Sequence, residues 1–219
     1  MIASKKPFKL WLEFHQPGQL ICMNPLSHTH SIRVDLPIWI GEFESSLNDV
    51  FPTIESRMLL AVELAAKNVS HESGGPFGAA VFDLDTGELV SLGINLVVDS
   101  GYSIAHAEIL ALAFAQNILG THDVSKSARP HLQLVTSVEP CSMCLGAIPW
   151  SGVKSVVCGA RTSDAEAVGF DEGPKLDSWP QELEKRGIAV RRDIEREAAI
   201  KPLQNYLQSG GAIYNGGGK

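Results

Sequence analysis

The sequence lacks any long apolar run, and no stretch approaches the roughly 18 consecutive apolar residues that a membrane-spanning helix needs. Lysines occur near the N-terminus, but Glu13 and His15 interrupt the apolar residues there before a signal-peptide core can form. We therefore expect a cytoplasmic protein with no membrane partner.

Cysteine and basic residues are also scarce. Four cysteines in 219 residues favour metal ligands or buried thiols over a disulfide framework. The 18 Lys and Arg residues are outnumbered by 25 Asp and Glu residues, which gives a formal net charge of −7. Because phosphate neutralisation supplies most of the affinity of a nucleic-acid-binding protein, this charge argues against a nucleic-acid partner.

The length and the 44% hydrophobic content predict one domain with an extension. Residues 1–52 mix isolated aromatics with prolines and show no sustained period, so we expect an arm that packs on the main body. Within it, Leu10–Phe14 predicts one short strand. His28 and His30 lie in a Ser/Thr-rich segment with no third ligand nearby, so we interpret them as loop residues.

Residues 53–219 show regular patterns and form the expected main domain. Strands that are apolar throughout are typical of a sheet covered on both faces, so we expect an α/β fold: a three-layer α/β/α sandwich with a mixed sheet of about five strands. The predicted elements are helices at Thr53–His71, Ala105–Leu119, Cys141–Trp150, Trp179–Arg186 and Ile194–Leu207, strands at Ala79–Asp83, Leu89–Val98, Leu132–Ser137, Val153–Ala160 and Ile188–Arg191, and an acidic loop at Ser163–Pro174.

Two short segments, His106–Glu108 and Pro140–Cys144, carry residues with metal chemistry. Cys141 and Cys144 are three positions apart at the start of a predicted helix, so both thiols lie on one face of its first turn. With His106 they supply three ligands of a tetrahedral zinc site. Three protein ligands and an open fourth position are typical of catalytic zinc.

Glu108 lies two residues after the histidine and is placed to take a proton from a zinc-activated water, which is general acid–base work. The combination of H-x-E with P-C-x-x-C is a signature of zinc deaminases that act on nucleobases. A structural zinc site would need a fourth ligand, for which Cys158 is the candidate, but its surroundings predict a buried strand. A redox pair would leave His106 unexplained, and a non-catalytic zinc-binding module would leave Glu108 unexplained.

The two segments resemble the cytidine deaminase-like superfamily of zinc-dependent enzymes. Further segments are similar to the bacterial-type guanine deaminases: Gly75–Ala79, Gly93–Asn95, Ala105–Ile109, Cys144–Trp150 and Glu166–Glu172. This resemblance implies zinc-dependent hydrolysis of guanine to xanthine and ammonia, a role in purine catabolism, and a homodimer. The alternatives are deamination of another free ring, such as a triazine or cytosine, or of adenosine in tRNA, although the tRNA-editing branch lacks the acidic Gly-Phe-Asp-Glu stretch and is usually basic.

The resemblance also implies roles for residues around the zinc. Glu172, with Asp171 beside it, would accept hydrogen bonds from the N1 and amino edge of guanine and relay a proton to the departing ammonia. Asn95 would read the base, and the backbone N–H of Ala107 would help to orient it. Phe77 and Trp150 would wall the planar ring. Tyr214 would cap the site from a C-terminal segment that this branch often exchanges between subunits.

Overall fold

The structure is a computed structural model and describes residues 32–216. From Val34 onward these residues belong to one compact unit. The expected strand at Leu10–Phe14, and His28 and His30, lie outside the described residues. Within the described part of the chain, no helix is both long and apolar enough to cross a membrane.

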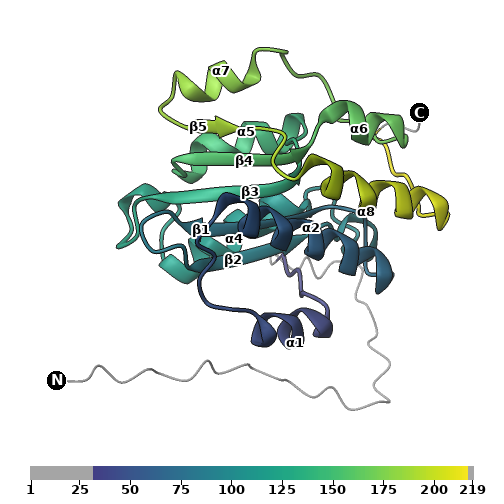
Figure 1. Cartoon of the computed structure of the whole chain (residues 1–219), viewed down its shortest axis with the longest axis horizontal. Helices are drawn as coiled ribbons and strands as arrows, with labels where there is room; N and C mark the ends of the chain where they lie inside the picture. The colour runs from purple at the N-terminus through teal and green to yellow at the C-terminus, as the bar shows by residue number, and fades with distance from the viewer. Residues whose placement is uncertain (1–31, 217–219) are drawn as a thin grey trace, which may run out of the picture. The chain divides into compact units, whose positions relative to one another are not determined.

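A single five-stranded mixed sheet forms the centre of this unit, with the strand order β2-β1-β3-β4-β5 (Figure 1). Strand β1 pairs antiparallel with both β2 and β3, whereas β3, β4 and β5 run parallel to one another. The mixed sheet expected from the sequence is therefore confirmed. The strands are β1 (Gly78–Asp83), β2 (Leu89–Ile94), β3 (Leu132–Val138), β4 (Ser155–Ala160) and β5 (Ala189–Arg191).

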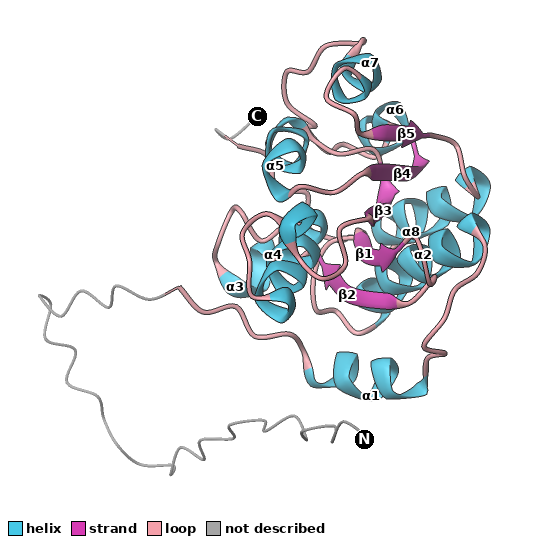
Figure 2. Ribbon diagram, turned by 90° about the vertical axis from the view of Figure 1, so that its left-hand side faces the viewer, coloured by secondary structure: helices cyan, strands magenta, loops and turns pink. Residues whose placement is uncertain are grey.

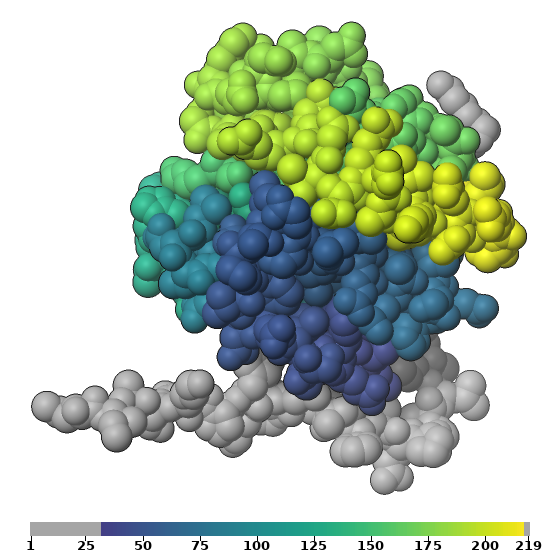
Figure 3. Space-filling view, viewed as in Figure 1, coloured from purple at the N-terminus to yellow at the C-terminus, as the bar shows by residue number. Residues whose placement is uncertain are grey.

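Helices cover both faces of the sheet, which confirms the three-layer sandwich (Figure 2). One face carries α2 (Ile54–Ser70) and α8 (Arg196–Gln208), which lie side by side (Figure 3). The other face carries α4 (Ala107–Leu119), α5 (Ser142–Ser151) and α7 (Trp179–Glu184). Alternation along β1 explains how one strand serves both cores, because Ala80 and Phe82 join the α2 side while Ala79 and Val81 join the α4 side.

The ends of the two long helices follow sequence signals. Thr53 caps α2, since its side chain accepts a hydrogen bond from the N–H of Ser56 and the Ser56 side chain accepts one from Thr53 in return. Gly120 ends α4 in the left-handed conformation, with φ of 66°, which an L side chain rarely adopts. Both boundaries lie within two residues of the predicted ones.

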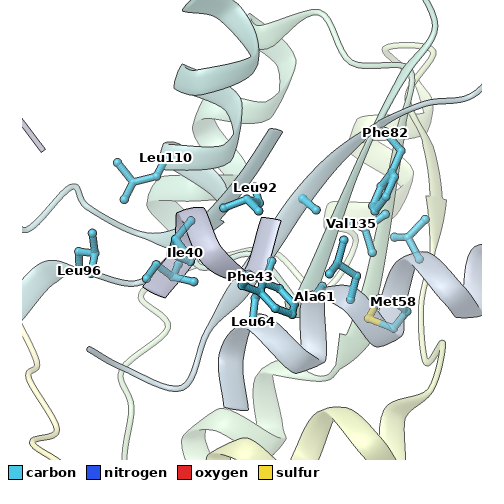
Figure 4. Close-up of a cluster of buried hydrophobic side chains, with 14 of the residues drawn as sticks. Ile40, Phe43, Met58, Ala61, Leu64, Phe82, Leu92, Leu96, Leu110 and Val135 are labelled. Carbon is cyan, nitrogen blue, oxygen red and sulfur yellow. The ribbon is translucent and has the colours of Figure 1, made fainter. Parts of the chain in front are cut away.

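The N-terminal arm contains a helix that its irregular sequence did not predict, α1 (Ile38–Ser46). Its Ile40 and Phe43 side chains are buried in the same cluster as Met58 and Leu64 of α2 (Figure 4). The described part of the arm thus packs on the sandwich, while the domain boundary at residue 52 stays a prediction.

Four further elements differ from the sequence expectations. Strand β2 ends at Ile94 instead of Val98, because the chain turns away there into the short helix α3 (Val97–Ser100). The acidic segment expected to be a loop contains α6 (Thr162–Ala167), whose first turn is closed by the Asp164 carboxylate accepting from the Arg161 N–H at 2.7 Å. A 3-10 turn, η1 (Val124–Lys126), precedes β3.

Candidate active site

Two helix N-termini meet at the carboxyl end of β3. After Val138 the chain turns through Pro140 into α5, and α4 begins directly after His106. Gly93 permits this arrangement, since a Cβ there would overlap the carbonyl oxygen of Ala107. The partial positive charge of both helix ends favours anionic groups between them.

His106, Cys141 and Cys144 have the geometry of a tetrahedral metal site. The Nδ1 atom of His106 lies 3.5 Å from the Cys141 Sγ and 3.6 Å from the Cys144 Sγ. A tetrahedral zinc ion with ordinary bond lengths separates nitrogen and sulfur ligands by about 3.6 Å. Among the described residues, these three are a group whose ligand atoms lie within 4.8 Å of one another. The donor set and spacing therefore fit zinc.

The protons of the two thiols are shared unequally. A hydrogen bond from Cys144, together with one from His106, lowers the pKa of Cys141 to about 4, although burial opposes this. The same pairing and burial raise the pKa of Cys144. Burial alone would lower the pKa of His106, but its hydrogen bond with Cys141 and the charge of Glu108 outweigh it and raise that pKa. A metal ion that binds here displaces these protons, because a cysteine must lose its proton to become a ligand.

Two buried carboxyl groups face the same cavity as the metal ligands His106 and Cys141. Glu108 and Glu172 are each 6% exposed. Burial, with the nearby Cys141 thiolate, raises the pKa of Glu108, and the same two causes raise the pKa of Glu172 to about 8. Buried carboxyl groups with raised pKa values are suited to acid–base chemistry.

The cavity has a volume of about 280 Å³ and gathers most of the predicted site residues. Phe77 forms one wall and meets the Phe170 ring edge-on at a centroid distance of 4.8 Å. The predicted residues along its lining are Phe77, Asn95, His106, Glu108, Cys141, Asp171, Glu172 and Tyr214.

The loop that carries Glu172 is tied down on two sides. On one side, the N–H of Ser142 at the start of α5 donates to the Glu172 carbonyl at 2.9 Å, and Lys175 Nζ donates to the Pro140 carbonyl at 2.7 Å. On the other, the Asn215 side chain accepts from the Asp171 N–H at 2.9 Å and donates to the Gly169 carbonyl at 3.1 Å. These contacts fix the carboxylate beside the metal ligands.

Tyr214 reaches the metal site within its own chain. Its hydroxyl group lies 2.5 Å from His106 Nε2, and the two rings meet nearly at right angles. With Nδ1 on a metal, Nε2 carries the proton and donates it to the tyrosine oxygen, which fixes the orientation of the imidazole. Exchange of this segment between subunits stays a prediction.

The side chains of two predicted substrate contacts, Trp150 and Ala107, are not part of the cavity lining. Trp150 is 83% exposed and does not line this cavity. It follows Cys144 by six residues, which turns a helix by about 240° and carries its side chain off the ligand face. Within this chain Trp150 therefore lies off the cavity, and its role as a wall for the base stays a prediction. Ala107 is the first residue of α4, and its methyl group is buried in the core below the site.

Glu139 borders the cavity, and the sequence reasoning missed it. It is 3% exposed, and its carboxylate accepts hydrogen bonds from Arg192 Nε at 2.6 Å and from the N–H and hydroxyl groups of Thr162 at 3.0 and 2.8 Å. An acidic residue that ends an apolar strand just before a ligand-bearing turn was the available signal, since buried charges require partners.

Zinc held by one histidine and two cysteines, with a glutamate beside the open position, is the arrangement of nucleobase deaminases. The fold and the site place this protein in that class of zinc-dependent hydrolases.

Comparisons with known proteins narrow this class. Residues 52–160 match the cytidine and deoxycytidylate deaminase zinc-binding region. The guanine deaminase of Bacillus subtilis is 39% identical over 118 residues, which are 54% of this chain and 71% of that protein. A solved structure of guanine deaminase from Nitrosomonas europaea is 46% identical with a TM-score of 0.77, covering 81% of this chain and 97% of the other. The chain belongs to the bacterial guanine deaminase family, and its cofactor is zinc.

More distant relatives act on RNA. A tRNA-specific adenosine deaminase of Buchnera aphidicola is 30% identical over 122 residues, which are 56% of this chain and 74% of that protein. Relatives of this chain therefore act on different substrates, and the residues of its own site distinguish between them.

Proposed function

We propose that this protein hydrolyses guanine to xanthine and ammonia. The observation that carries the proposal is the position of Glu172, a buried carboxyl group facing the same small cavity as His106, Cys141 and Glu108. Guanine presents the N1–H and the 2-amino group as adjacent donors, so a pocket for it needs an acceptor at that edge. Another solved structure, 47% identical with a TM-score of 0.78, holds 2,6-diaminopurine, which like guanine is a 2-aminopurine.

The reaction adds water to C2 of the base and releases the amino group. Zinc at His106, Cys141 and Cys144 would lower the pKa of a water so that it ionises near neutral pH. Glu108 would accept a proton from the attacking water as the oxygen of the water bonds to C2. Glu108 then delivers a proton to the amino nitrogen, the C2–N bond breaks, and ammonia leaves.

The remaining residues of the cavity bind and orient the base. Glu172 accepts from N1–H and the amino group, and with a pKa of about 8 it can relay a proton to the departing ammonia. The Asn95 amide both donates and accepts, which suits the O6 and N7 edge. Phe77 covers one face of the ring, and the Ala107 N–H at the start of α4 helps to orient it. Asp171 stands at the exposed rim.

A free base is favoured over adenosine in tRNA. The net charge of −7 would repel a polyanion, and the cavity of about 280 Å³ is suited to a single base.

To test this, zinc-loaded protein is incubated with guanine, cytosine, ammeline as a triazine, and an adenosine-containing tRNA anticodon stem-loop, and ammonia release is measured. We expect turnover of guanine with xanthine as the product. Turnover of another substrate without guanine would overturn the proposal.

We also propose that the protein works as a cytoplasmic homodimer in purine catabolism. Support for a dimer comes from apolar side chains on the outer surfaces of α4 and α5, among them Ile118 at 57% and Trp150 at 83% exposure. An interaction surface needs exposed apolar side chains of this kind.

A further inference from the structure

Asn68 is a buried amide that contacts the site from outside. It lies in the last turn of α2 and is fully buried. Its Nδ2 donates two hydrogen bonds, to the carbonyl oxygens of Gly75 and Asn95, both at 2.8 Å. Its Oδ1 has no hydrogen-bond partner among the described residues. An unpaired buried acceptor destabilises the fold, so the two hydrogen bonds that Nδ2 donates have to offset this cost.

The backbone that Asn68 holds has left the sheet. The register of β1 and β2 ends at Ile94, opposite Gly78, so Asn95 lies just beyond the paired strands. Its N–H donates to the Phe77 carbonyl at 3.1 Å, and its carbonyl receives the Asn68 bond. Asn68 thus provides the donor that a neighbouring strand would otherwise supply.

Two glycines allow this close approach. A Cβ at Gly74 would overlap the Asn95 carbonyl and come within 2.9 Å of Asn68 Nδ2, and one at Gly75 would lie 3.1 Å from Asn95 Oδ1. The backbone at Gly74–Gly75 and the Asn68 amide therefore enclose Asn95 from behind, while its side chain faces the cavity.

We propose that Asn68 is a positioning residue that sets substrate affinity by fixing the orientation of the Asn95 amide toward the base. This inference rests on the proposed base-reading role of Asn95. A displacement of about 1 Å in a positioning group can cost on the order of a hundredfold in rate, so a brace behind Asn95 has kinetic consequences.

The test is Asn68→Ala in the zinc-loaded enzyme. We expect kcat/KM for guanine to fall about tenfold, mainly through a higher KM, because Asn95 binds the base before the reaction as well as during it. Zinc content should equal that of the unchanged protein. If Asn68→Ala is insoluble, Asn68→Ser keeps one donor and should lose about threefold. Unchanged kinetics in a folded variant would overturn the inference.

Gln133→Ala separates positioning from lost stability. Gln133 is also a buried amide with two side-chain hydrogen bonds, to Arg57 at 3.0 Å and Ser155 at 3.1 Å, but it lies at the start of β3, away from the site. We expect it to lower the thermal midpoint comparably and to leave KM unchanged. An equal rise in KM in both variants would mean that Asn68 is merely structural.

A double-mutant cycle shows whether Asn68 acts through Asn95. In the Asn95→Ala background, Asn68→Ala should change kcat/KM by less than about twofold, since the group it positions is gone. Additive losses would overturn the inference. Absence of guanine turnover in the unchanged protein would instead contradict the proposed function, and normal kinetics in Asn95→Ala would contradict the role of Asn95.

Discussion

Glu108 combines a buried position with a helix end. It is the second residue of α4, where the partial positive charge of the helix N-terminus stabilises its anion, while burial favours the neutral acid. These opposing effects leave the carboxyl group able to both take and return a proton. A neutral amide of the same shape would keep its contacts and lose only this ability.

Glu108→Gln should therefore retain zinc and lower kcat for guanine by about two orders of magnitude or more. Metal content measured by mass spectrometry and steady-state kinetics check both parts. Glu166→Gln, an exposed carboxylate in α6, is the matched control and should turn over normally. A zinc-loaded Glu108→Gln protein with full turnover would remove Glu108 from the mechanism.

The metal ligands and Glu108 were predictable from local motifs, because these residues lie at or next to the first turn of α4 or α5 and short sequence spacings determine their positions. Asn68 was not predictable, since its role depends on a hydrogen bond to a residue 27 positions later. Glu139 likewise bonds to Arg192, 53 positions away. Contacts over such separations depend on the topology of the sheet, which one sequence does not reveal. The base-contacting assignments, among them Asn95 and Glu172, came from family resemblance.

At the scale of elements, the turn from β3 to α5 depends on the ion pair between the buried Glu139 and the partly exposed Arg192. Glu139→Gln removes the charge that this arginine bonds. Because Arg192 is 34% exposed, water screens part of the interaction, and the substitution should destabilise the fold by about 1–2 kcal/mol. Denaturant unfolding of the zinc-loaded protein measures this loss. Glu182→Gln breaks an exposed ion pair with Lys185 and should leave the free energy of unfolding nearly unchanged. Equal effects of the two substitutions would contradict a special role for the turn.

Helices α6 and α8 are joined by a second ion pair that predicts a pH dependence. Hydrogen bonds from Arg196 at 2.8 and 2.9 Å hold the pKa of Asp164 below its usual range. A pKa that is lower in the folded state stabilises the fold above the unfolded value, about 3.9, and the stabilisation is lost as the pH falls through the folded pKa.

The difference in unfolding free energy between the unchanged protein and Asp164→Asn should therefore be constant from pH 7 to about 5 and shrink below about pH 4. Urea unfolding across this range measures it. The exposed Asp177→Asn serves as the control for a surface carboxylate. A difference that persists undiminished at pH 3 would show that this ion pair does not stabilise the fold.

Elements were predictable in proportion to their length and periodicity. The long helices and the apolar strands followed their patterns closely, whereas α1 and α6 are short and gain their stability from contacts. In α1, burial of Ile40 and Phe43 against α2 overrides an irregular sequence. In α6, the Asp164 side chain closes a turn inside a segment that reads as an acidic loop.

At the scale of the whole molecule, the outer layer of α4 and α5 is the candidate dimer surface. Trp150→Glu would place a charge in its centre and should convert a dimer to a monomer, measured by light scattering after gel filtration. Leu207→Glu, a half-exposed apolar residue of α8 on the opposite face of the sheet, should leave the mass unchanged. A monomeric unchanged protein, or a dimeric Trp150→Glu variant, would contradict this assignment.

The three metal ligands lie on helices that belong to different halves of the sheet, so metal binding affects how these halves are held together. His106 begins a helix that rests on β1 and β2, the antiparallel half of the sheet, while Cys141 and Cys144 begin the helix that connects the parallel strands β3 and β4. An ion bound to all three would act as a reversible crosslink between the two halves, closing a loop of about 35 residues as a disulfide does. Without the ion, the seam between the halves would be bridged mainly by the pairing of β1 with β3 and by α2 across the opposite face.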